Sequence, residues 1–375
     1  MKKVAILIFL VLLGWLGFSL WKNFKSEAPR NSLKLEVPLK NPFTSASKIS
    51  VLASSLEVPW AIGFLPDRTI LVTERAGTLR FIDKNGQLAP SPVAIIDDVR
   101  QIGEGGLLGI AIHPKFQDNQ YIYLYYTYSS NGVNTLNRVV RYKFDGTSLG
   151  DEKIIVDAIP GAVFHDGGRI KFGPDGFLYI TTGDARDPSL SQNRGSLAGK
   201  ILRVTDDGAV AKGNPFGTFV YSLGHRNPQG ITWDDQNNLW ETEHGPSGEK
   251  GLCCHDEINL VESGENYGWP EIVGTESRTN LISPILESDN DTWAPSGAAF
   301  LNGSIFFAGL RGTALYEYRI NDKKLVTHFK GEFGRIREVI VGPDGFLYIT
   351  TSNRDGRGTP AKDDDRIIRI NPQKF

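Results

Sequence analysis

Cysteine is almost absent from this chain of 375 residues, which contains only Cys253 and Cys254. A disulfide framework needs several separated cysteines, so the class of small disulfide-stapled folds is excluded. The adjacent pair could be two free thiols, a vicinal disulfide or a contact to a soft metal. Of these, we favour free or vicinally paired thiols in a loop.

A strong net charge is also missing. The 41 Lys and Arg against 43 Asp and Glu leave a formal charge of −2, which gives no reason to expect nucleic acid as a partner. Long helical hydrophobic periods are lacking in the body of the chain, whereas 41 glycines and 20 prolines favour many turns. The hydrophobic content of 40% can bury a full core, as one large domain or two ordinary ones.

The N-terminus carries the longest apolar run, Val4 to Trp21, directly after Lys2 and Lys3. Eighteen helical residues rise about 27 Å, close to the roughly 30 Å of bilayer hydrocarbon. Pro29 makes the preceding Ser-Glu-Ala a poor cleavage site. We expect residues 1–25 to be an export signal or, preferably, an uncleaved membrane anchor. Residues 26–47 are expected to be a polar, Pro-containing linker, with the rest of the protein periplasmic or extracellular.

The remainder of the chain repeats itself. Residues 169–187 and 338–356 share a strand, a Pro-Asp-Gly turn, a second strand and a polar loop in almost identical letters. Weaker copies lie at residues 61–83, 108–128, 230–246 and 297–320. Six such units have the scale of propeller blades rather than of solenoid coils. The sequence therefore predicts an all-β protein, with a six-bladed β-propeller over residues 48–375.

Such a ring needs a closing contact. We expect a strand within residues 48–60 to pair with the last blade, whose final strand reads IIRINP at residues 367–372. That pairing would remove open sheet edges, which otherwise invite aggregation.

One stretch, residues 221–246, contains two polar clusters around an alternating segment that predicts a hairpin turning at residues 235–238. His225, Arg226 and Asn227 precede the hairpin, and Glu243 with His244 ends it, so both clusters should face the same side. Guanidinium and amide groups make directional bonds in a plane, which suits a planar polar ligand. A turn with solvated charges is the alternative.

Similar polar residues recur in loops that we place after the inner strands, where a propeller brings them together at one face. His165 lies in a Gly-rich loop, and a neutral histidine there could accept a proton; a structural or solvated histidine is the alternative. Alternation places Arg335 and Arg337 on one strand face, where two guanidiniums repel unless an anion lies between them. That anion could be a buried acidic side chain or a carboxylate-rich ligand.

Seven ordered strings resemble those of one known family: QIGEGGLLGIAIHPKF, FHDGGRIKFGPDGFLYITTGD, SLAGKILRV, YSLGHRNPQG, EHGPSG, HDEINLVESGENYGWP and WAPSGAAF. They look like the soluble pyrroloquinoline quinone (PQQ) dependent aldose dehydrogenases, the glucose/sorbosone dehydrogenase family, from about Lys48 to the C-terminus. The resemblance implies a six-bladed propeller, PQQ, calcium, and oxidation of an aldose at its anomeric carbon to a lactone. An external acceptor such as a quinone or a cytochrome would take the electrons.

The resemblance also implies site residues. His165 matches the general base, and Arg226 with Asn227 matches the pair that contacts the quinone oxygens. The other residues it assigns to the cofactor are Glu104, Gln229, Thr292, Arg311, Arg335 and Arg337. The residues it assigns to calcium are Gly245 and Pro246, through their carbonyls at the cofactor, and Glu257 and Tyr267 at a second, structural site.

Two other classes compete with this one. A calcium-dependent propeller hydrolase, such as a lactonase, needs a calcium deep in the channel held by acidic side chains, whereas the loops here offer mostly arginines. A non-catalytic binding propeller would leave His165, Arg226 and the arginine pair without a shared task. We therefore favour the dehydrogenase.

Overall fold

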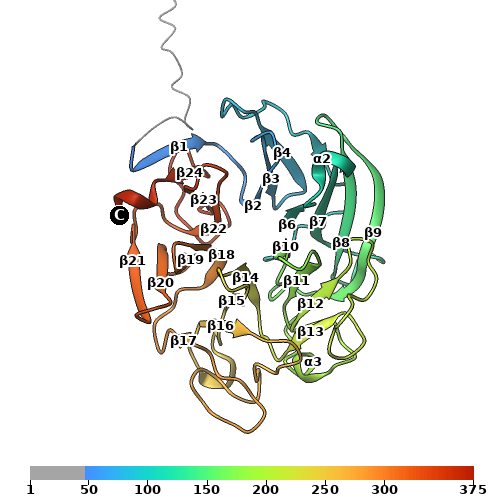
Figure 1. Ribbon diagram of the computed structural model, residues 1–375, viewed down its shortest axis with the longest axis vertical. Coiled ribbons are helices and arrows are strands. Elements are labelled where there is room, and N and C mark those ends of the chain that lie inside the picture. Colours follow the sequence, from blue (N-terminus) through green and yellow to red (C-terminus); the bar gives the residue numbers. More distant parts are fainter. Residues whose placement is uncertain (1–46) are drawn as a thin grey trace, which may run out of the picture. The chain divides into compact units, whose positions relative to one another are not determined.

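The computed structural model describes residues 47–375, which form six four-stranded antiparallel sheets arranged in a ring (Figure 1). The predicted six-bladed propeller is confirmed. No helix in this described part is long and apolar enough to cross a bilayer. The predictions of an anchor at residues 4–21 and a linker at 26–47 fall almost entirely outside it.

Each of the first three blades uses four consecutive strands, ordered outward from the central axis. Blade 1 comprises β2 (Pro59–Phe64), β3 (Ile70–Glu74), β4 (Thr78–Ile82) and β5 (Ala94–Ile95). Blade 2 comprises β6 (Leu107–Ile112), β7 (Tyr121–Tyr128), β8 (Leu136–Phe144) and β9 (Leu149–Pro160). Blade 3 comprises β10 (Ile170–Phe172), β11 (Leu178–Thr182), β12 (Lys200–Val204) and β13 (Val220–Leu223).

Blades 4 and 5 follow the same plan, and blade 6 differs only in its outermost strand, which comes from the other end of the described chain. Blade 4 comprises β14 (Pro228–Trp233), β15 (Leu239–Glu243), β16 (Glu257–Val261) and β17 (Leu286–Glu287). Blade 5 comprises β18 (Pro295–Leu301), β19 (Ser304–Gly309), β20 (Ala314–Arg319) and β21 (Lys324–His328). Blade 6 comprises β22 (Ile336–Val341), β23 (Leu347–Thr351), β24 (Ile367–Ile370) and β1 (Ile49–Ala53). The short helices are α2 (Phe116–Asn119), α3 (Ser189–Gln192) and the 3-10 turns η2 (Glu249–Gly251) and η3 (Pro372–Lys374).

The second strand of a blade is buried on both faces because neighbouring blades pack face to face. Strands β3, β11, β15, β19 and β23 are buried at every position. Their sequences, such as LYITT in β11 and β23, are accordingly rich in β-branched and aromatic residues rather than alternating with polar ones.

The sequence duplication extends to side-chain contacts at the Pro-Asp-Gly turns. In blade 3, Asp175 accepts hydrogen bonds from the Tyr179 hydroxyl at 2.9 Å and from Arg203 Nε at 2.9 Å. In blade 6, Asp344 accepts the equivalent bonds from Tyr348 at 2.9 Å and Arg369 at 2.7 Å. The final glycine of each turn has positive φ, +81° at Gly176 and +74° at Gly345, where a side chain would be strained. The repeat therefore preserves a complete local unit, not only a hydrophobic pattern.

Ring closure also follows the prediction. Strand β1 pairs antiparallel with β24, with Ile49 opposite Ile370 and Val51 opposite Ile368. The first described strand thus becomes the outer strand of the last blade, and the ring is held shut by main-chain hydrogen bonds.

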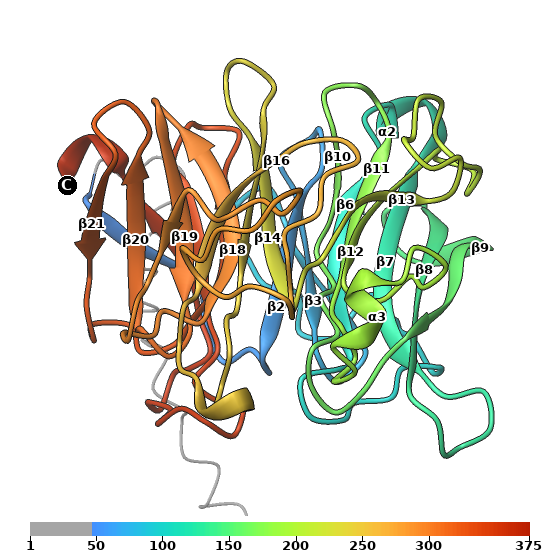
Figure 2. The ribbon, with the colours of Figure 1, turned by 90° about the horizontal axis from the view of Figure 1, so that it is seen from below.

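The two polar clusters around the blade 4 hairpin face the same side, as predicted. The polar loops as a group, however, do not directly follow the innermost strands, as we had expected. They precede the innermost strand and follow the second strand of each blade: Arg226 precedes β14, Glu243 ends β15, and Pro228 pairs with Glu243. The loop that directly follows an innermost strand lies at the opposite end, because antiparallel strands reverse direction there (Figure 2). The predicted hairpin of blade 4 does turn at residues 234–238, where Asp234 accepts the Asn238 N–H at 2.9 Å.

Candidate active site

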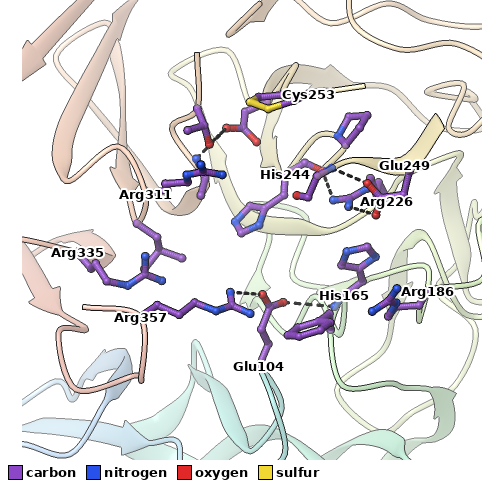
Figure 3. Close-up of a pocket in the computed structure, with 18 residues that line it drawn as sticks. Glu104, His165, Arg186, Arg226, His244, Glu249, Cys253, Arg311, Arg335 and Arg357 are labelled. Carbon is purple, nitrogen blue, oxygen red and sulfur yellow. Dashed lines mark hydrogen bonds and ion pairs between the residues drawn. A yellow bond between two sulfur atoms is a disulfide. The ribbon is translucent and has the colours of Figure 1, made fainter. Parts of the chain in front are cut away.

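A pocket of about 530 Å³ opens where the polar loops of blades 2 to 6 converge (Figure 3). Seven predicted site residues line it: Glu104, His165, Arg226, Pro246, Thr292, Arg311 and Arg335. The other lining residues are Phe164, Arg186, His244, Ser247, Glu249, Cys253, Cys254, Asp256, Ala294, Leu310 and Arg357. Six predicted residues do not line it: Asn227, Gln229, Arg337, Gly245, Glu257 and Tyr267.

His165 is held in one orientation by a buried carboxylate. Its Nδ1 lies 2.7 Å from Asp184 Oδ1, and the backbone at His165 adopts a positive φ of +67°. The second carboxylate oxygen of Asp184 accepts the Trp269 indole N–H at 2.8 Å. A carboxylate oxygen accepts hydrogen bonds, so the contact assigns the ring N–H to Nδ1 and leaves Nε2 as the acceptor. His165 is therefore arranged to take a proton from a ligand in the pocket.

Arg226 projects into the same pocket from the loop before β14. Its Nη2 donates to Glu249 Oε1 at 2.7 Å, and its Nη1 donates to the His244 carbonyl at 3.2 Å. Its guanidinium also lies 5.4 Å from the ring centre of Trp269. The backbone N–H of Arg226 donates to Glu243 Oε2 at 2.8 Å, which fixes the loop to the end of β15.

The neighbouring Asn227 and Gln229 support the pocket from beneath. Asn227 Oδ1 accepts the Gly167 N–H at 3.1 Å, so it connects the loop of blade 4 to the loop that carries His165. Gln229 Oε1 accepts a hydrogen bond from Arg337 Nη1 at 2.7 Å. Neither side chain is among the lining residues, and their direct contact with a cofactor stays a prediction.

Arg335 and Arg337 have different surroundings. Arg335 lines the pocket, and its Nε lies 2.8 Å from Asp355 Oδ2, so a buried acidic side chain does accompany the pair. Arg337 lies deeper in the channel, is 4% exposed, and has its guanidinium 5.8 Å from the Trp60 ring. Burial lowers the pKa of Arg337, an effect that Asp355 partly offsets.

The pocket carries an excess of positive charge. Five arginines line it against three carboxylates, those of Glu104, Glu249 and Asp256. Glu104 is already paired with Arg357 at 2.9 Å, although the two residues come from blades far apart in sequence. Half-buried His244 faces the pocket; burial lowers its pKa to about 3, and its Nε2 has no hydrogen-bond partner among the described residues. The site thus fits a ligand with several negative charges.

Asp256 organises the pocket rim. It accepts N–H bonds from Gly245 at 3.0 Å, Trp293 at 2.7 Å and Ala294 at 2.8 Å, and a weaker bond from the Thr292 hydroxyl at 3.3 Å. These bonds join the segment after β15 to the loop before β18. Both oxygens of Asp256 are therefore occupied by the protein itself.

The two cysteines are joined. A disulfide links Cys253 to Cys254, and both residues line the pocket. Of the forms left open by the sequence, the structure has the vicinal disulfide.

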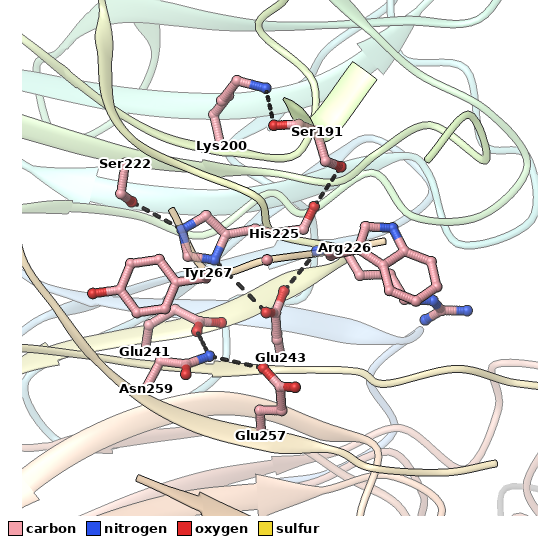
Figure 4. Close-up of polar contacts among 12 residues, drawn as sticks. Ser191, Lys200, Ser222, His225, Arg226, Glu241, Glu243, Glu257, Asn259 and Tyr267 are labelled. Atoms are coloured by element: carbon pink, nitrogen blue, oxygen red, sulfur yellow. Dashed lines mark hydrogen bonds and ion pairs between the residues drawn. The ribbon is translucent and has the colours of Figure 1, made fainter. Parts of the chain in front are cut away.

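A second polar cluster lies within blade 4 (Figure 4). Glu241, Glu243 and Glu257 are deeply placed, and Asn259 Nδ2 donates to both Glu241 and Glu257, at 3.0 and 3.2 Å. Burial raises the pKa of all three carboxyls, and that of Glu243 to about 7. His225 completes a potential metal-binding group with Glu241 and Glu243, whose ligand atoms all lie within 4.8 Å of one another.

Three atoms in this carboxylate cluster have no hydrogen-bond partner among the described residues: Glu241 Oε1, Asn259 Oδ1 and His225 Nδ1, although His225 Nδ1 lies 3.7 Å from Glu243 Oε1. Three neighbouring carboxyls, one of which has an oxygen without a hydrogen-bond partner, suit a hard cation, which prefers oxygen ligands. Tyr267, also predicted here, packs its ring against His225 with the centres 4.8 Å apart. The sequence had pointed to Glu257 and Tyr267 but not to Glu241 and Glu243.

Other residues were not assigned from the sequence because their roles depend on distant partners. Asp184 orients His165 from a different loop, Asp355 accompanies Arg335, and Glu249 is paired with Arg226. The only sequence signal for Asp184 is its place after β11, which corresponds to Asn353 after β23 in the duplicated unit.

Comparisons with known proteins agree with this geometry. Residues 56–368 match the family model described as Glucose / Sorbosone dehydrogenase. The PQQ-bound form of an aldose sugar dehydrogenase from Streptomyces coelicolor superimposes with a TM-score of 0.79 at 40% identity, covering 86% of this chain and 97% of that one. The aldose sugar dehydrogenase YliI of Escherichia coli is 30% identical over 345 residues, which are 82% of this chain and 91% of the relative.

A shorter match is to quinoprotein glucose dehydrogenase B of Acinetobacter calcoaceticus, 33% identical over 258 residues, or 60% of this chain and 52% of that protein. The family model covers most of the propeller and includes the loops that build the pocket. These similarities indicate a sugar dehydrogenase. The chain belongs to the glucose/sorbosone dehydrogenase family.

Proposed function

We propose that this protein is a PQQ-dependent aldose dehydrogenase that oxidises the anomeric carbon of an aldose to a lactone and passes the electrons to an external acceptor. The observation that carries the proposal is the pairing of His165 with Asp184 at the wall of an arginine-lined pocket. The similarity to a PQQ-bound aldose sugar dehydrogenase supports the choice of cofactor.

The residues present fit PQQ. It carries three carboxylates, and the pocket lining has five arginines, of which Arg186 and Arg311 have no carboxylate partner among the described ion pairs. The pocket volume of about 530 Å³ is of the size that small-molecule sites have. When bound, PQQ would supply the quinone that accepts a hydride from the anomeric carbon.

Calcium is the second group that we propose. Pro246 lines the pocket next to Gly245, and backbone carbonyls are ligands that calcium accepts. The adjacent Asp256 is not a ligand in this arrangement because its oxygens accept four protein hydrogen bonds. The carboxylate cluster of blade 4 would hold a separate, structural cation through Glu241, Glu243 and Glu257.

The chain's own chemistry is proton transfer and charge stabilisation. His165 Nε2 would remove the proton of the anomeric hydroxyl, and Asp184 would stabilise the resulting imidazolium through Nδ1–H. Arg226 and His244 would face the negative charge that develops at the pocket centre. Phe164 would shield the His165 side of the pocket from water.

Turnover measurements test this function. Protein reconstituted with PQQ and calcium should oxidise several aldoses with an artificial acceptor and release the lactone. Absence of turnover with every aldose, in protein that has bound PQQ, would contradict the proposal. Hydrolysis of added lactones without any oxidation would instead favour the hydrolase, whose metal would have to lie in the channel rather than in blade 4.

The location remains a proposal as well. We propose export, with residues 4–21 as a membrane anchor and a membrane quinone or cytochrome as acceptor, because the apolar run is long enough to span. Full-length protein should fractionate with membranes, whereas a mature N-terminus close to Pro29 would show a cleaved signal.

A further inference from the structure

Arg226 is engaged by the protein itself. Its side chain is 3% exposed, and its ion pair with Glu249 has an N–O distance of 2.7 Å (Figure 3). Arg226 Nε has no partner among the described residues, so the guanidinium is not saturated. A buried guanidinium needs an anion nearby, because burial without one is costly. In this structure Glu249 supplies that anion.

Glu249 is carried by a small flap, which we define as residues 247–254. Ser247 and Cys253 form a bridge across it, and Gly248 N–H donates to the Leu252 carbonyl at 2.9 Å. The turn η2 forms its tip. The Glu249 carboxylate also accepts the Ser247 N–H at 2.5 Å, so its position is tied to the fold of the flap.

The C-terminal end of the flap, which we call the leg, is fixed to the rest of the fold, whereas the backbone of its tip is more permissive. At the leg, the Cys253–Cys254 disulfide joins adjacent residues, and His255 N–H donates to the Asp289 carbonyl at 2.9 Å. At the tip, Gly248 and Gly251 have φ of +109° and +74°, and no heavy atom lies within 4 Å of the position of an added Cβ. Glycine makes such a tip conformationally permissive. The flap can therefore change at its tip while its leg stays in place.

We propose that Glu249 is a latch, by which we mean a residue that pairs with Arg226 in the cofactor-free protein and releases it when the anionic cofactor binds. The tip of the flap moves away from Arg226 as the ion pair opens. The proposal rests on the proposed function, since PQQ is the anion concerned. The guanidinium N–H that donates to Glu249 cannot at the same time donate to the quinone oxygens of PQQ, to which the family resemblance assigns Arg226. Cofactor binding therefore includes the cost of opening one ion pair.

The Glu249→Gln variant tests the latch because it keeps the side-chain size and removes the charge. PQQ should bind calcium-loaded Glu249→Gln about tenfold more tightly than wild type. The reason is that the charge-assisted hydrogen bond between Arg226 and Glu249 no longer competes with the cofactor. Glu271→Gln is the matched control: Glu271 pairs with Arg278 at 2.6 Å in an exposed ion pair outside the pocket lining. Its PQQ affinity should equal that of wild type.

Thermal unfolding gives an independent readout. Without PQQ, Glu249→Gln should have a lower Tm than wild type, because Arg226 has lost its counter-charge; with saturating PQQ, the difference should disappear. A residue that only stabilises the flap would lower Tm equally in both states, and that result would overturn the latch. Equal or weaker PQQ affinity in Glu249→Gln would overturn it too. Failure of the wild type itself to bind PQQ would overturn both the latch and the proposed function.

Discussion

At the scale of single residues, the arginines of blade 6 show how position decides role. Arg335 faces the pocket with Asp355 behind it, whereas Arg337 donates to Gln229 inside the channel. We expect Arg335→Ala to weaken PQQ binding by about 1.5–3 kcal/mol, the range for hydrogen bonds to charged groups. Arg337→Ala should mainly lower Tm, because Gln229 loses its donor. Titrations with PQQ and unfolding curves of both variants check this, and a larger affinity loss in Arg337→Ala would contradict it.

A second prediction concerns Asp166, next to His165. Burial raises its pKa to about 7, although Asn137 and the Ala162 N–H lower it; its Oδ2 has no partner among the described residues. An acid whose pKa is higher in the folded than in the unfolded protein stabilises the fold below its unfolded pKa, near 4. This stability is lost as the pH rises to about 7.

Asp166→Asn imitates the protonated acid, so its Tm should exceed that of wild type by more at pH 8 than at pH 5. Asp145→Asn is a suitable control. Asp145 is exposed, and hydrogen bonds from Thr147 lower its pKa to about 2, so its substitution should change Tm equally at pH 5 and pH 8. A Tm difference between Asp166→Asn and wild type that is the same at both pH values would contradict the assignment.

Residue types could be predicted from the sequence, but residue pairs could not. His165 and Arg226 stand in recognisable strings, Arg335 was singled out by strand alternation, and all three line the pocket. Their partners come from other loops or blades: Glu104 and Arg357 are 253 positions apart and meet only because the ring closes. Nothing local in the sequence specifies such a contact.

At the scale of elements, the strands that flank the Pro-Asp-Gly turns were predictable. Pro, Asp and Gly mark a turn, and the runs of β-branched residues on either side mark buried strands. The flap was not, since residues 247–254 have no counterpart in the other repeats. The loops of the pocket were assigned to the wrong strand ends, because a repeated pattern does not show where each blade begins.

Strand β1 gives a prediction at this scale. Its Leu52 and Ala53 are buried, and its main chain covers the edge of β24. A protein starting at Asn41 should fold and remain monodisperse, whereas one starting at Ser54 should lose stability and aggregate, because β24 becomes an open edge. Size-exclusion chromatography with thermal unfolding checks this. Equal behaviour of the two proteins would show that closure by β1 is dispensable.

At the scale of the whole molecule, two calcium roles should be separable. Without PQQ, calcium at a hundredfold excess over Kd should stabilise the fold by about 2.7 kcal/mol through the carboxylate cluster. Glu257→Gln should reduce this gain, yet keep calcium-dependent PQQ binding, which we assign to the carbonyls of Gly245 and Pro246. Unfolding curves and PQQ titrations with calcium or with EDTA measure the two effects. Unchanged stability on calcium addition to metal-free wild type would contradict a structural site in blade 4.

The central claim is that one ring of loops positions a base beside a bound quinone cofactor. General bases contribute typically 10²–10⁴-fold to rate, so His165→Ala should load PQQ normally and react that much more slowly. The most direct measurement mixes PQQ-loaded protein with aldose in the absence of oxygen and acceptor, and follows the cofactor's absorption spectrum. We predict fast reduction with one lactone released per PQQ in wild type, and a 10²–10⁴-fold slower change in His165→Ala. Equal rates in the two loaded proteins, or no reduction in wild type, would contradict the account.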